Sequence, residues 1–409
     1  MSEKVPITII GGGVIGCAIA YKLSKIIDKD IFLIERNQKI GGENQSSRNS
    51  GVIHAGLYYS REKAPLKAEF CVKGSQMLYD FCREHSVPHK KTGKLVVATN
   101  TKEEEYIDAL MKLAIDNGVR GIKKIDGSEA RLLEPNINIT AALYAPTSGI
   151  IDATRLVLKL NVLAHNQGTH FVTGNEVVDI SPIDTGFKVT TTSGGQSEQF
   201  ETELLINAAG VNSDLIARMV NPDSPYEIGP IRGESVQFNK RKRPELVMNG
   251  LNVYPAPYGV WPNGEKADLS YEKFLRVSSK ENVSMFVGVH LTPTFEEVDG
   301  DYVIGRTVTI GPALVGNVEK EDYKETRPKE YYFQCVKEFF PGIKLDDIEL
   351  FQTGIVAVLE GHNDFIIERD PKFPKCINCV GICSPGLTAS LAIAEHVKEM
   401  TLNENTGLT

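Results

Sequence analysis

The sequence has no excess of positive charge, few cysteines and no hydrophobic run long enough to cross a membrane. Its 45 Lys and Arg are outnumbered by 53 Asp and Glu, so the formal net charge of −8 disfavours nucleic acid as a partner. The seven Cys are an odd number in mostly apolar stretches, which argues against a disulfide framework and favours a reducing, cytoplasmic location. Any contact with a membrane is then expected to be peripheral.

The composition is that of a globular protein with ample material for a core. The chain has 409 residues, of which 41% are hydrophobic and 24% are charged, and this length predicts two or three domains. Its 36 Gly and 20 Pro are typical of a loop-rich α/β enzyme.

A strand, a glycine turn and a helix open the chain. The β-branched run Ile7–Ile10 predicts a central parallel strand, and Cys17–Ile26 predicts a helix. Between them, Gly11 permits a tight turn, Gly13 lets backbone amides approach a pyrophosphate, and Gly16 allows close packing of helix and strand. The pattern predicts a dinucleotide site.

A carboxylate follows the second strand at the spacing that a dinucleotide site requires. Glu35 ends the apolar run Ile31–Ile34, where it can accept hydrogen bonds from ribose hydroxyls, and Arg36 comes next. An NAD enzyme usually continues through further strand and helix units. This chain instead enters a polar, glycine-rich segment at residues 41–51, which is typical of a loop that holds a ligand.

Several longer motifs carry a family resemblance along nearly the whole chain. They include the segments Ser46–Ser60, Pro146–Asp152, Ile206–Gly210 and Ser384–Ser390. With these motifs the chain resembles the FAD-dependent L-2-hydroxyglutarate dehydrogenases and oxidases. The wider group includes D-amino acid oxidase, glycine oxidase and glycerol-3-phosphate oxidase.

The resemblance implies non-covalent FAD, held by residues from six parts of the sequence. These residues are Gly11, Gly13, Val14, Ile15, Gly16, Glu35, Arg36, Ser46, Ser47, Asn49, Ser50, Gly51, Val177, Ala208, Ala209, Gly210, Pro385, Gly386, Leu387 and Thr388. In the last part, Val380–Ser384 predicts a strand, and Thr388 is expected to cap a helix over Ala389–Met400. An ordinary capped helix would explain the cap but not the whole motif.

Oxidation of a 2-hydroxy acid requires a base that is neutral near pH 7, and His54 is the first candidate. Its family counterpart faces the flavin, and an imidazole is suited to accept the hydroxyl proton. Two other roles remain open at this point, because His54 could orient the flavin or tether it covalently. No metal is expected to take part.

Four further residues are candidates for binding the substrate. Tyr58 could donate a hydroxyl or only pack, and His290 could roof the pocket or be an ordinary core histidine. Arg232 could grip a carboxylate as a fork, or it could pair with Glu234 or lie at the surface.

One departure from the family concerns the substrate anchor. Many relatives carry Gly-Ile-Arg before the last strands, and that Arg binds the substrate carboxylate, whereas this chain reads Gly354-Ile355-Val356. Arg306 is a hypothetical substitute.

Two other segments have uncertain roles. Tyr258–Ser284 predicts an inserted loop, which could be a lid, a docking surface for an electron acceptor or an uninvolved surface excursion. Cys376, Cys379 and Cys383 have a spacing similar to a metal or cluster site, but buried thiols packing as small hydrophobic residues are the preferred interpretation.

The predicted fold is α/β. A discontinuous Rossmann-like FAD-binding domain is expected over residues 1–90, 145–225 and 345–409. A substrate-binding α+β domain with a mixed sheet is expected over 91–144 and 226–344. Within the second domain, Met285–Leu291 predicts one strand and Lys102–Leu133 is helical in pattern.

The expected reaction is the FAD-dependent oxidation of L-2-hydroxyglutarate to 2-oxoglutarate, with electrons passing to oxygen or to a membrane quinone or other carrier. The alternatives are oxidation of glycerol 3-phosphate or an amino acid, or a flavin-binding scaffold without catalysis.

Overall fold

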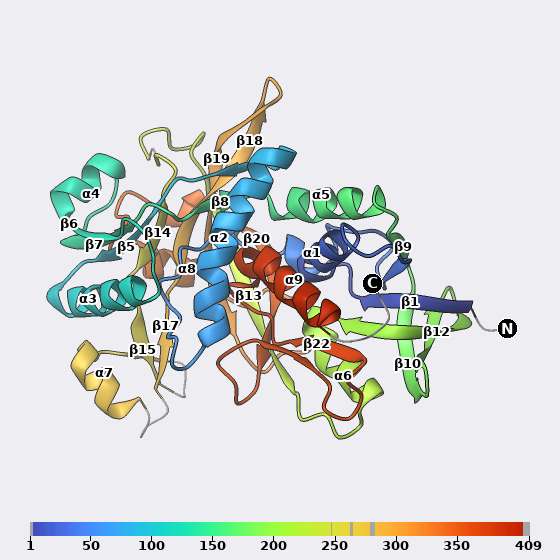
Figure 1. Cartoon of the computed structure of the whole chain (residues 1–409). Coiled ribbons are helices and arrows are strands. Elements are labelled where there is room, and N and C mark those ends of the chain that lie inside the picture. Colours follow the sequence, from blue (N-terminus) through green and yellow to red (C-terminus); the bar gives the residue numbers. More distant parts are fainter. Residues whose placement is uncertain (1–2, 247, 262–264, 279–282, 404–409) are drawn as a thin grey trace.

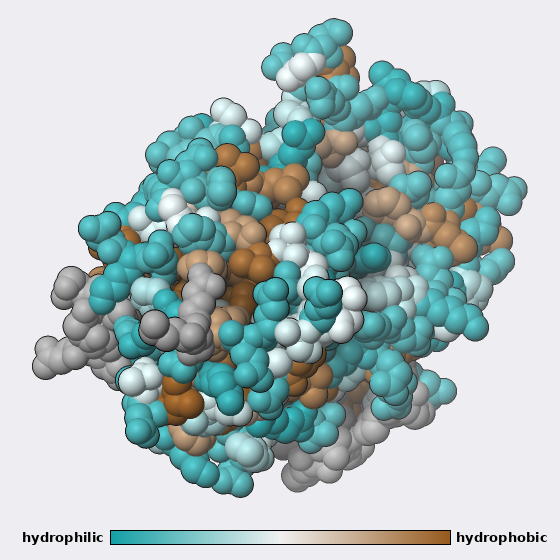
Figure 2. Space-filling view, turned by 90° about the vertical axis from the view of Figure 1, so that its right-hand side faces the viewer, coloured by the Kyte–Doolittle hydropathy of each residue, from teal (hydrophilic) through white to brown (hydrophobic). Residues whose placement is uncertain are grey.

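The structure is a computed structural model that describes residues 3–246, 248–261, 265–278 and 283–403. Two large sheets dominate it, one at the right of Figure 1 and the other at its centre and left. Hydrophilic residues cover the larger part of the face shown in Figure 2, as expected for a chain in which 24% of residues are charged.

The first sheet has the strand order β10-β11-β12-β1-β2-β9, with β22 paired to β12 and β21 paired to β22. Strands β22, β12, β1, β2 and β9 run parallel, while β10, β11 and β21 are antiparallel additions. The strands are β1 (Glu3–Ile10), β2 (Ile31–Glu35), β9 (His170–Thr173), β10 (Glu176–Ile183), β11 (Gly186–Ser193), β12 (Gln196–Asn207), β21 (Ile366–Arg369) and β22 (Cys376–Val380).

Helices cover this sheet because its parallel strands are buried on both faces. They are α1 (Val14–Leu23), α2 (Pro65–His85), α5 (Ala153–His165), α6 (Ser213–Val220) and α9 (Gly386–Leu402). In Figure 1 the blue α2 and the red α9 cross the middle of the molecule beside each other. Gly74 of α2 makes this approach possible, because a Cβ there would lie 2.4 Å from the Thr388 carbonyl oxygen of α9.

The second sheet is mixed and has the order β20-β13-β19-β18-β14-β5-β7-β6. Only the β14–β5 pairing is parallel among its described strand pairs. Its strands are β5 (Lys94–Ala98), β6 (Lys123–Asp126), β7 (Ala141–Ala145), β13 (Ile228–Asn239), β14 (Asn252–Pro255), β18 (His290–Val298), β19 (Asp301–Val315) and β20 (Ile348–Leu359). The helices α3 (Thr101–Asp116), α4 (Gly127–Leu133) and α8 (Lys329–Val336) accompany it.

Two small sheets and short helical turns complete the fold. One sheet contains β3 (Val52–Ile53), β8 (Gly149–Ile151) and β4 (His89–Lys90), and the other contains β15 (Tyr258–Val260), β16 (Lys266–Ala267) and β17 (Ser284–Phe286). The 3-10 turns are η1 (Gln45–Ser47), η2 (Gly210–Asn212) and η3 (Leu345–Asp347).

The α/β fold predicted from the sequence is confirmed, and the second sheet is mixed as expected. The predicted domain boundaries stay a prediction. The segment 258–284, expected to be an inserted loop, forms part of a sheet and the helix α7 (Tyr271–Val277) where it is described. Phe274 of α7 packs on Tyr106 of α3 with ring centroids 6.1 Å apart, so this segment is anchored to the second sheet's helices.

Four expected elements have different bounds. The helix predicted from Cys17 begins at Val14, directly after the glycine turn. The strand predicted over Met285–Leu291 is two strands, because Gly288 has a φ of +76° and ends the extended conformation. The strand predicted at Val380–Ser384 lies earlier, at Cys376–Val380, and α9 begins three residues before the predicted start.

Candidate functional site

A cavity of about 250 Å³ lies at the carboxyl ends of β1 and β2. Ligands bind at this edge in open α/β sheets. Nine of the predicted cofactor residues line it: Gly11, Gly13, Glu35, Arg36, Ser46, Val177, Ala208, Ala209 and Gly210. The structure therefore brings together residues that lie up to about two hundred positions apart in the sequence.

Backbone geometry at the glycine turn leaves no room for side chains. Gly11 has a φ of +109°, and a Cβ there would lie 2.4 Å from the carbonyl oxygen of Ala208. A Cβ on Gly16 would lie 1.9 Å from the Gly11 carbonyl oxygen. Because glycines occupy these two positions, the N-terminus of α1 can lie close to β1 and β12. Val14 and Ile15 form the first turn of α1 and are buried.

The Glu35 carboxylate is fixed at the end of β2. One oxygen accepts a hydrogen bond from the Gly12 N–H at 2.6 Å, and the other accepts from the Asn37 N–H at 2.9 Å. Each carboxylate oxygen has a further lone pair, so the group can also accept hydrogen bonds from vicinal hydroxyls. Arg36 also lines the cavity, and its guanidinium pairs with Glu321 at 2.6 Å.

The same cavity has lining residues that sequence reasoning did not identify. Asn44, Gln45, Asn175, Asn212 and Tyr323 supply polar groups, and Leu215 and Met219 of α6 supply apolar surface. Tyr323 could not be found from local motifs, because it comes from the loop before α8. It is held there by the Gln45 amide, which donates to its hydroxyl at 2.7 Å.

A second cavity, of about 300 Å³, lies where the polar loop after β2 meets the second sheet. Four predicted cofactor residues line it, and these are Ser47, Asn49, Ser50 and Gly51. Opposite them lie Thr294 and Phe295 of β18 and Gln352 of β20. The Gln352 amide donates to the Asn49 carbonyl at 3.1 Å, which joins the loop to the second sheet.

The N-terminal turn of α9 contacts the segment that carries His54. Pro385 is the N-cap residue, and Gly386, Leu387 and Thr388 form the first helical turn. The prediction that Thr388 caps the helix is wrong, because its hydroxyl serves another chain segment. It accepts from the His54 N–H at 3.0 Å and donates to the Val52 carbonyl at 3.3 Å, so α9 holds His54 in place.

The side chain of His54 has an unpartnered nitrogen and a lowered pKa. Its Nδ1 is buried and has no hydrogen-bond partner among the residues that the structure describes. Burial and then the charge of Lys94 lower the pKa of His54 well below 6.5, so the imidazole is neutral near pH 7. A neutral imidazole with a free nitrogen can accept a proton.

Tyr58 and His290, both predicted substrate residues, lie in the same cluster as His54. The Tyr58 hydroxyl is buried and unpartnered within the described chain, and burial raises its pKa. The His290 ring stacks on Tyr254 with centroids 3.7 Å apart, and its Nδ1 lies 3.0 Å from the Thr292 hydroxyl. Burial, Lys94 and His54 together lower the pKa of His290.

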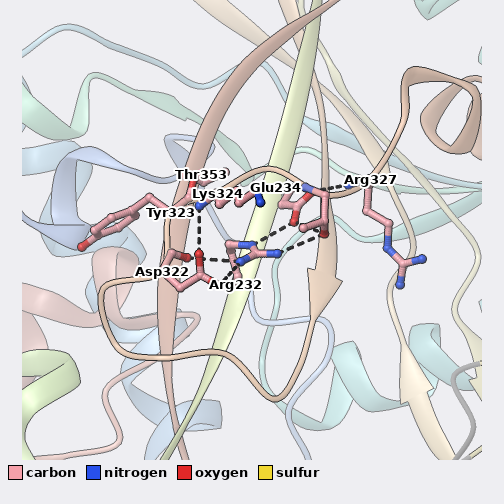
Figure 3. Close-up of polar contacts among 8 residues, drawn as sticks. Arg232, Glu234, Asp322, Tyr323, Lys324, Arg327 and Thr353 are labelled. Carbon is pink, nitrogen blue, oxygen red and sulfur yellow. Dashed lines mark hydrogen bonds and ion pairs between the residues drawn. The ribbon is translucent and has the colours of Figure 1, made fainter.

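Arg232 lies apart from this cluster, in a buried ion-pair network (Figure 3). Its Nε donates to Glu234 at 2.8 Å, one terminal nitrogen donates to Asp322 at 2.5 Å, and the other donates to the Thr326 hydroxyl at 3.0 Å. Glu234 also accepts from the backbone N–H groups of Thr326 and Arg327. Of the roles considered from the sequence, the structure favours the ion pair with Glu234 over a grip on substrate.

Arg306, the hypothetical replacement for the missing anchor, is also outside the cluster. It lies on β19 with 54% of its side chain exposed, and its Nε is 3.7 Å from a Glu296 oxygen. Val356 is in β20 and pairs with Ile231 of β13. The structure thus gives no support to Arg306 as a substitute, because its charge faces solvent and an acidic neighbour.

Two of the three neighbouring cysteines pack in the core, and Cys383 is half-buried. Cys376 and Cys379 are buried in β22 among apolar core residues, and burial raises the pKa of the Cys379 thiol to about 12. Within the described residues no group of His, Cys, Asp and Glu is arranged to hold a metal ion. In the same part of the chain, every helix is too short or too polar to span a bilayer.

Comparison with known families decides the class of the protein. Residues 6–400 match the family described as FAD dependent oxidoreductase. The chain belongs to this family. The protein is therefore an enzyme, and it uses FAD, which agrees with the glycine turn, the fixed Glu35 carboxylate and the cavity beside them.

Relatives of this FAD dependent oxidoreductase match it over nearly its full length. The mitochondrial L-2-hydroxyglutarate dehydrogenase of Caenorhabditis elegans is 30% identical over 98% of this chain and 94% of its own. The glycerol 3-phosphate dehydrogenase of Caloramator mitchellensis is also 30% identical, over 97% of this chain and 74% of its own.

A solved structure supports the same fold for this FAD dependent oxidoreductase. The L-alpha-glycerophosphate oxidase of Mycoplasma pneumoniae, solved in its reduced form with FAD bound, is 26% identical. It matches with a TM-score of 0.81 over 97% of this chain and 94% of its own. The resemblance read from the motifs is confirmed at the level of the family and the cofactor.

Proposed function

We propose that this enzyme oxidises a small 2-hydroxy acid, L-2-hydroxyglutarate, to the 2-oxo acid, with His54 as the base. The observation that carries the proposal is the neutral, unpartnered imidazole of His54, held by Thr388 at the N-terminus of α9. The name of the Caenorhabditis elegans relative supports the choice of substrate.

The residues of the first cavity fit the nucleotide half of FAD. Glu35 would bind the ribose hydroxyls, and the small residues Gly11, Gly13 and Ala209 would leave space for the pyrophosphate. Val177 would lie at the adenine. Ser46 is positioned by the hydrogen bond that its hydroxyl accepts from the Val14 N–H at 2.8 Å.

Eight further predicted residues would hold the flavin half. Ser47, Asn49, Ser50 and Gly51 line the second cavity, and Pro385–Thr388 begin α9. A helix N-terminus carries a partial positive charge that favours an anionic ligand. FAD, when bound, supplies the acceptor for the two electrons that leave the substrate as hydride.

His54 would take the proton of the substrate hydroxyl while the hydride leaves the α-carbon. The base must be neutral to do this, and its lowered pKa keeps it neutral from pH 7 to below pH 6.5. Tyr58 and His290 would line the substrate pocket. Tyr58 has a free hydroxyl to offer, whereas the His290 ring is already stacked and bonded.

Glycerol 3-phosphate is the second candidate substrate. A glycerol 3-phosphate dehydrogenase is among the relatives, and Val356 stands where many relatives carry the Arg that binds a substrate carboxylate. Electrons would pass to oxygen or to a membrane quinone or other carrier, with the enzyme in the cytoplasm or peripheral at a membrane.

Anaerobic reduction of the purified holoenzyme tests the substrate. L-2-hydroxyglutarate is expected to bleach the yellow absorbance of the flavin. D-2-hydroxyglutarate, glycerol 3-phosphate and glycine are expected to leave this absorbance unchanged. Bleaching by glycerol 3-phosphate alone would transfer the proposal to the second candidate. An enzyme that no member of the panel reduces would contradict both.

His54→Asn tests the base. The rate of flavin reduction is expected to fall about 10²- to 10⁴-fold, the usual contribution of a general base. The control is His165→Asn in α5, whose Nδ1 lies near the Thr169 carbonyl and which is expected to keep the full rate.

The pH profile separates a base from a residue that only orients the flavin. With His54 as base, the wild-type rate at saturating substrate is expected to fall only when the pH drops well below 6.5. If His54→Asn retains FAD and keeps most of the rate with the same acid limb, an orienting role is correct instead.

A further inference from the structure

Lys94, the first residue of β5, carries a buried charge to which neither the sequence motifs nor the proposed mechanism assigns a role. Only 1% of the residue is exposed, and its Nζ has no hydrogen-bond partner in the part of the chain that the structure describes. Among the same residues no carboxylate forms an ion pair with it. A buried charge is normally paired, so this ammonium group needs an explanation.

Aromatic rings account for part of the environment of Lys94. Its Nζ lies 3.6 Å from the ring centroid of Tyr254 and 5.4 Å from that of Tyr58. His290 stacks on Tyr254 at 3.7 Å, so the ammonium group and the imidazole must occupy opposite faces of the Tyr254 ring. Cation–π attraction recovers only part of the cost of removing an ammonium group from water.

The groups that face Lys94 leave its charge uncompensated. They come from the segment after β3, from α2, from β14 and from β18, and they are His54, Tyr58, Cys71, Tyr254 and His290. Burial raises the pKa of the Cys71 thiol to about 12 and raises the pKa of both tyrosines, so none is anionic at neutral pH. The two histidines are neutral.

Unpartnered polar atoms are concentrated at this place. The Lys94 Nζ, the Tyr58 hydroxyl and the His54 Nδ1 are all buried, and all lack a partner among the described residues. One such atom can be a local defect, but three in one cluster, one of them charged, are typical of a site that a polar ligand completes.

We propose that Lys94 binds the carboxylate next to the reacting carbon of the substrate, with the Tyr58 hydroxyl as a second donor. The inference rests on the proposed oxidation of a 2-hydroxy acid. His54 must contact the hydroxyl on the α-carbon, and the carboxylate is attached to that same carbon, so a cation beside His54 meets this carboxylate. Lys94 then supplies the charge that relatives provide through the Arg replaced here by Val356.

Other cations of the chain are less suited to this role. Arg48 has an unpartnered Nε, but its guanidinium lies 4.5 Å from the ring centroid of Tyr323 and donates to the Thr353 carbonyl at 3.4 Å. These contacts place it near the first cavity and away from His54. Arg232 is engaged by Glu234 and Asp322, and Arg306 is exposed.

The protonation state of Lys94 gives the site a pH dependence. Burial lowers the pKa of Lys94 to about 7, so the free enzyme carries the charge below pH 7 and loses it above. Affinity for the carboxylate is therefore expected to fall as the pH rises through 7. An Arg at this position stays charged and is expected to remove that dependence.

The test is a titration of the oxidised holoenzyme with 2-oxoglutarate, the product, followed by the change in flavin absorbance. At pH 6, Lys94→Met is expected to raise the dissociation constant about 10- to 100-fold, the loss of one charge-assisted hydrogen bond. Tyr58→Phe is expected to raise it several-fold, the loss of a neutral one. Wild-type affinity is expected to weaken from pH 6 to pH 8.5, and that of Lys94→Arg is expected to stay constant.

Lys67→Met is the matched control, because Lys67 is also buried but donates to the Asn363 carbonyl at 2.7 Å, away from this cluster. It is expected to bind 2-oxoglutarate like the wild type. If Lys94→Met retains FAD and binds 2-oxoglutarate as the wild type does, the role of Lys94 is disproved while the proposed function stands. A wild-type enzyme that neither binds 2-oxoglutarate nor is reduced by L-2-hydroxyglutarate overturns both.

Discussion

Arg232 and Lys94 are two buried cations of the same enzyme with opposite surroundings. Arg232 is 2% exposed and donates to Glu234, Asp322 and Thr326 (Figure 3). Lys94 is 1% exposed, its ammonium group lies against two aromatic rings, and it has no hydrogen-bond partner within the described structure. The chain supplies carboxylates that pair with Arg232, whereas the described residues supply none that pairs with Lys94.

The difference indicates that Arg232 has a structural role and that Lys94 binds a ligand. A buried ion pair with saturated hydrogen bonds joins distant segments, here β13 and the loop before α8. A buried cation without a counter-charge costs stability in the free protein, and binding of an anion compensates for that cost. The two residues should therefore respond in opposite ways when their charges are removed.

The largest expected effect on stability is at Arg232. Arg232→Met leaves the Glu234 carboxylate buried without its cation, and we expect the free energy of unfolding to fall by about 3 to 5 kcal/mol. Chemical denaturation of the holoenzyme measures it. Arg218→Met is a control, because Arg218 is 41% exposed and its loss at Asp214 is expected to cost less. A loss below about 1 kcal/mol at Arg232 would contradict the structural role.

A gain in stability is expected at Lys94. Its pKa of about 7 in the folded protein lies below its ordinary value of 10.5, so the folded state disfavours the proton. The penalty is complete below pH 7 and disappears as the pH rises to 10.5, where both states are neutral. In the absence of substrate or product, the free energy of unfolding of Lys94→Met is thus expected to exceed that of the wild type by up to about 4 kcal/mol at pH 6.5.

The pH dependence makes this prediction distinctive. The gain from Lys94→Met should shrink when denaturation is repeated at pH 9, because part of the penalty has disappeared at that pH. A gain that does not change with pH would indicate improved apolar packing instead. A loss of stability at both pH values would mean that Lys94 has a structural partner.

The smallest effect is expected at Arg306, which is an exposed cation. Arg306→Ala removes a charge that faces solvent and Glu296, so stability should change by less than about 0.5 kcal/mol. The Michaelis constant for the hydroxy acid should also stay unchanged in steady-state assays. A strong rise would restore Arg306 as the substrate anchor.

Local patterns were sufficient for the nucleotide-binding part of the fold. Gly11, Gly13, Gly16 and Glu35 act within one strand–turn–helix–strand unit, and the cavity lies where their spacing placed it. Short-range steric demands and strand periodicity decide such a unit, so the sequence displays them directly. Family motifs then extended the prediction to Ala208–Gly210 and Val177.

Long-range contacts were beyond the reach of the same reasoning. Thr388 lies within the first turn of α9. Its hydroxyl bonds to the His54 N–H and the Val52 carbonyl only because α9 packs against the segment that contains β3. Arg232 was ambiguous, because its second carboxylate partner, Asp322, lies ninety positions away. No role for Lys94 could be assigned from the sequence, since a Lys that starts a strand is normally solvated.

From its order of residues alone, this chain specifies a dinucleotide-binding α/β unit, because glycines, β-branched runs and one acid at fixed spacings have few other solutions. That the dinucleotide is FAD follows from the family that residues 6–400 match. The pairing of the chain's buried Arg and Lys residues is not determined by such spacings. Whether a given Arg or Lys holds the fold together or faces a ligand depends on which carboxylates the folded chain brings within a few ångströms of it. That distance is a property of the packed sheets and helices, and no local pattern contains it.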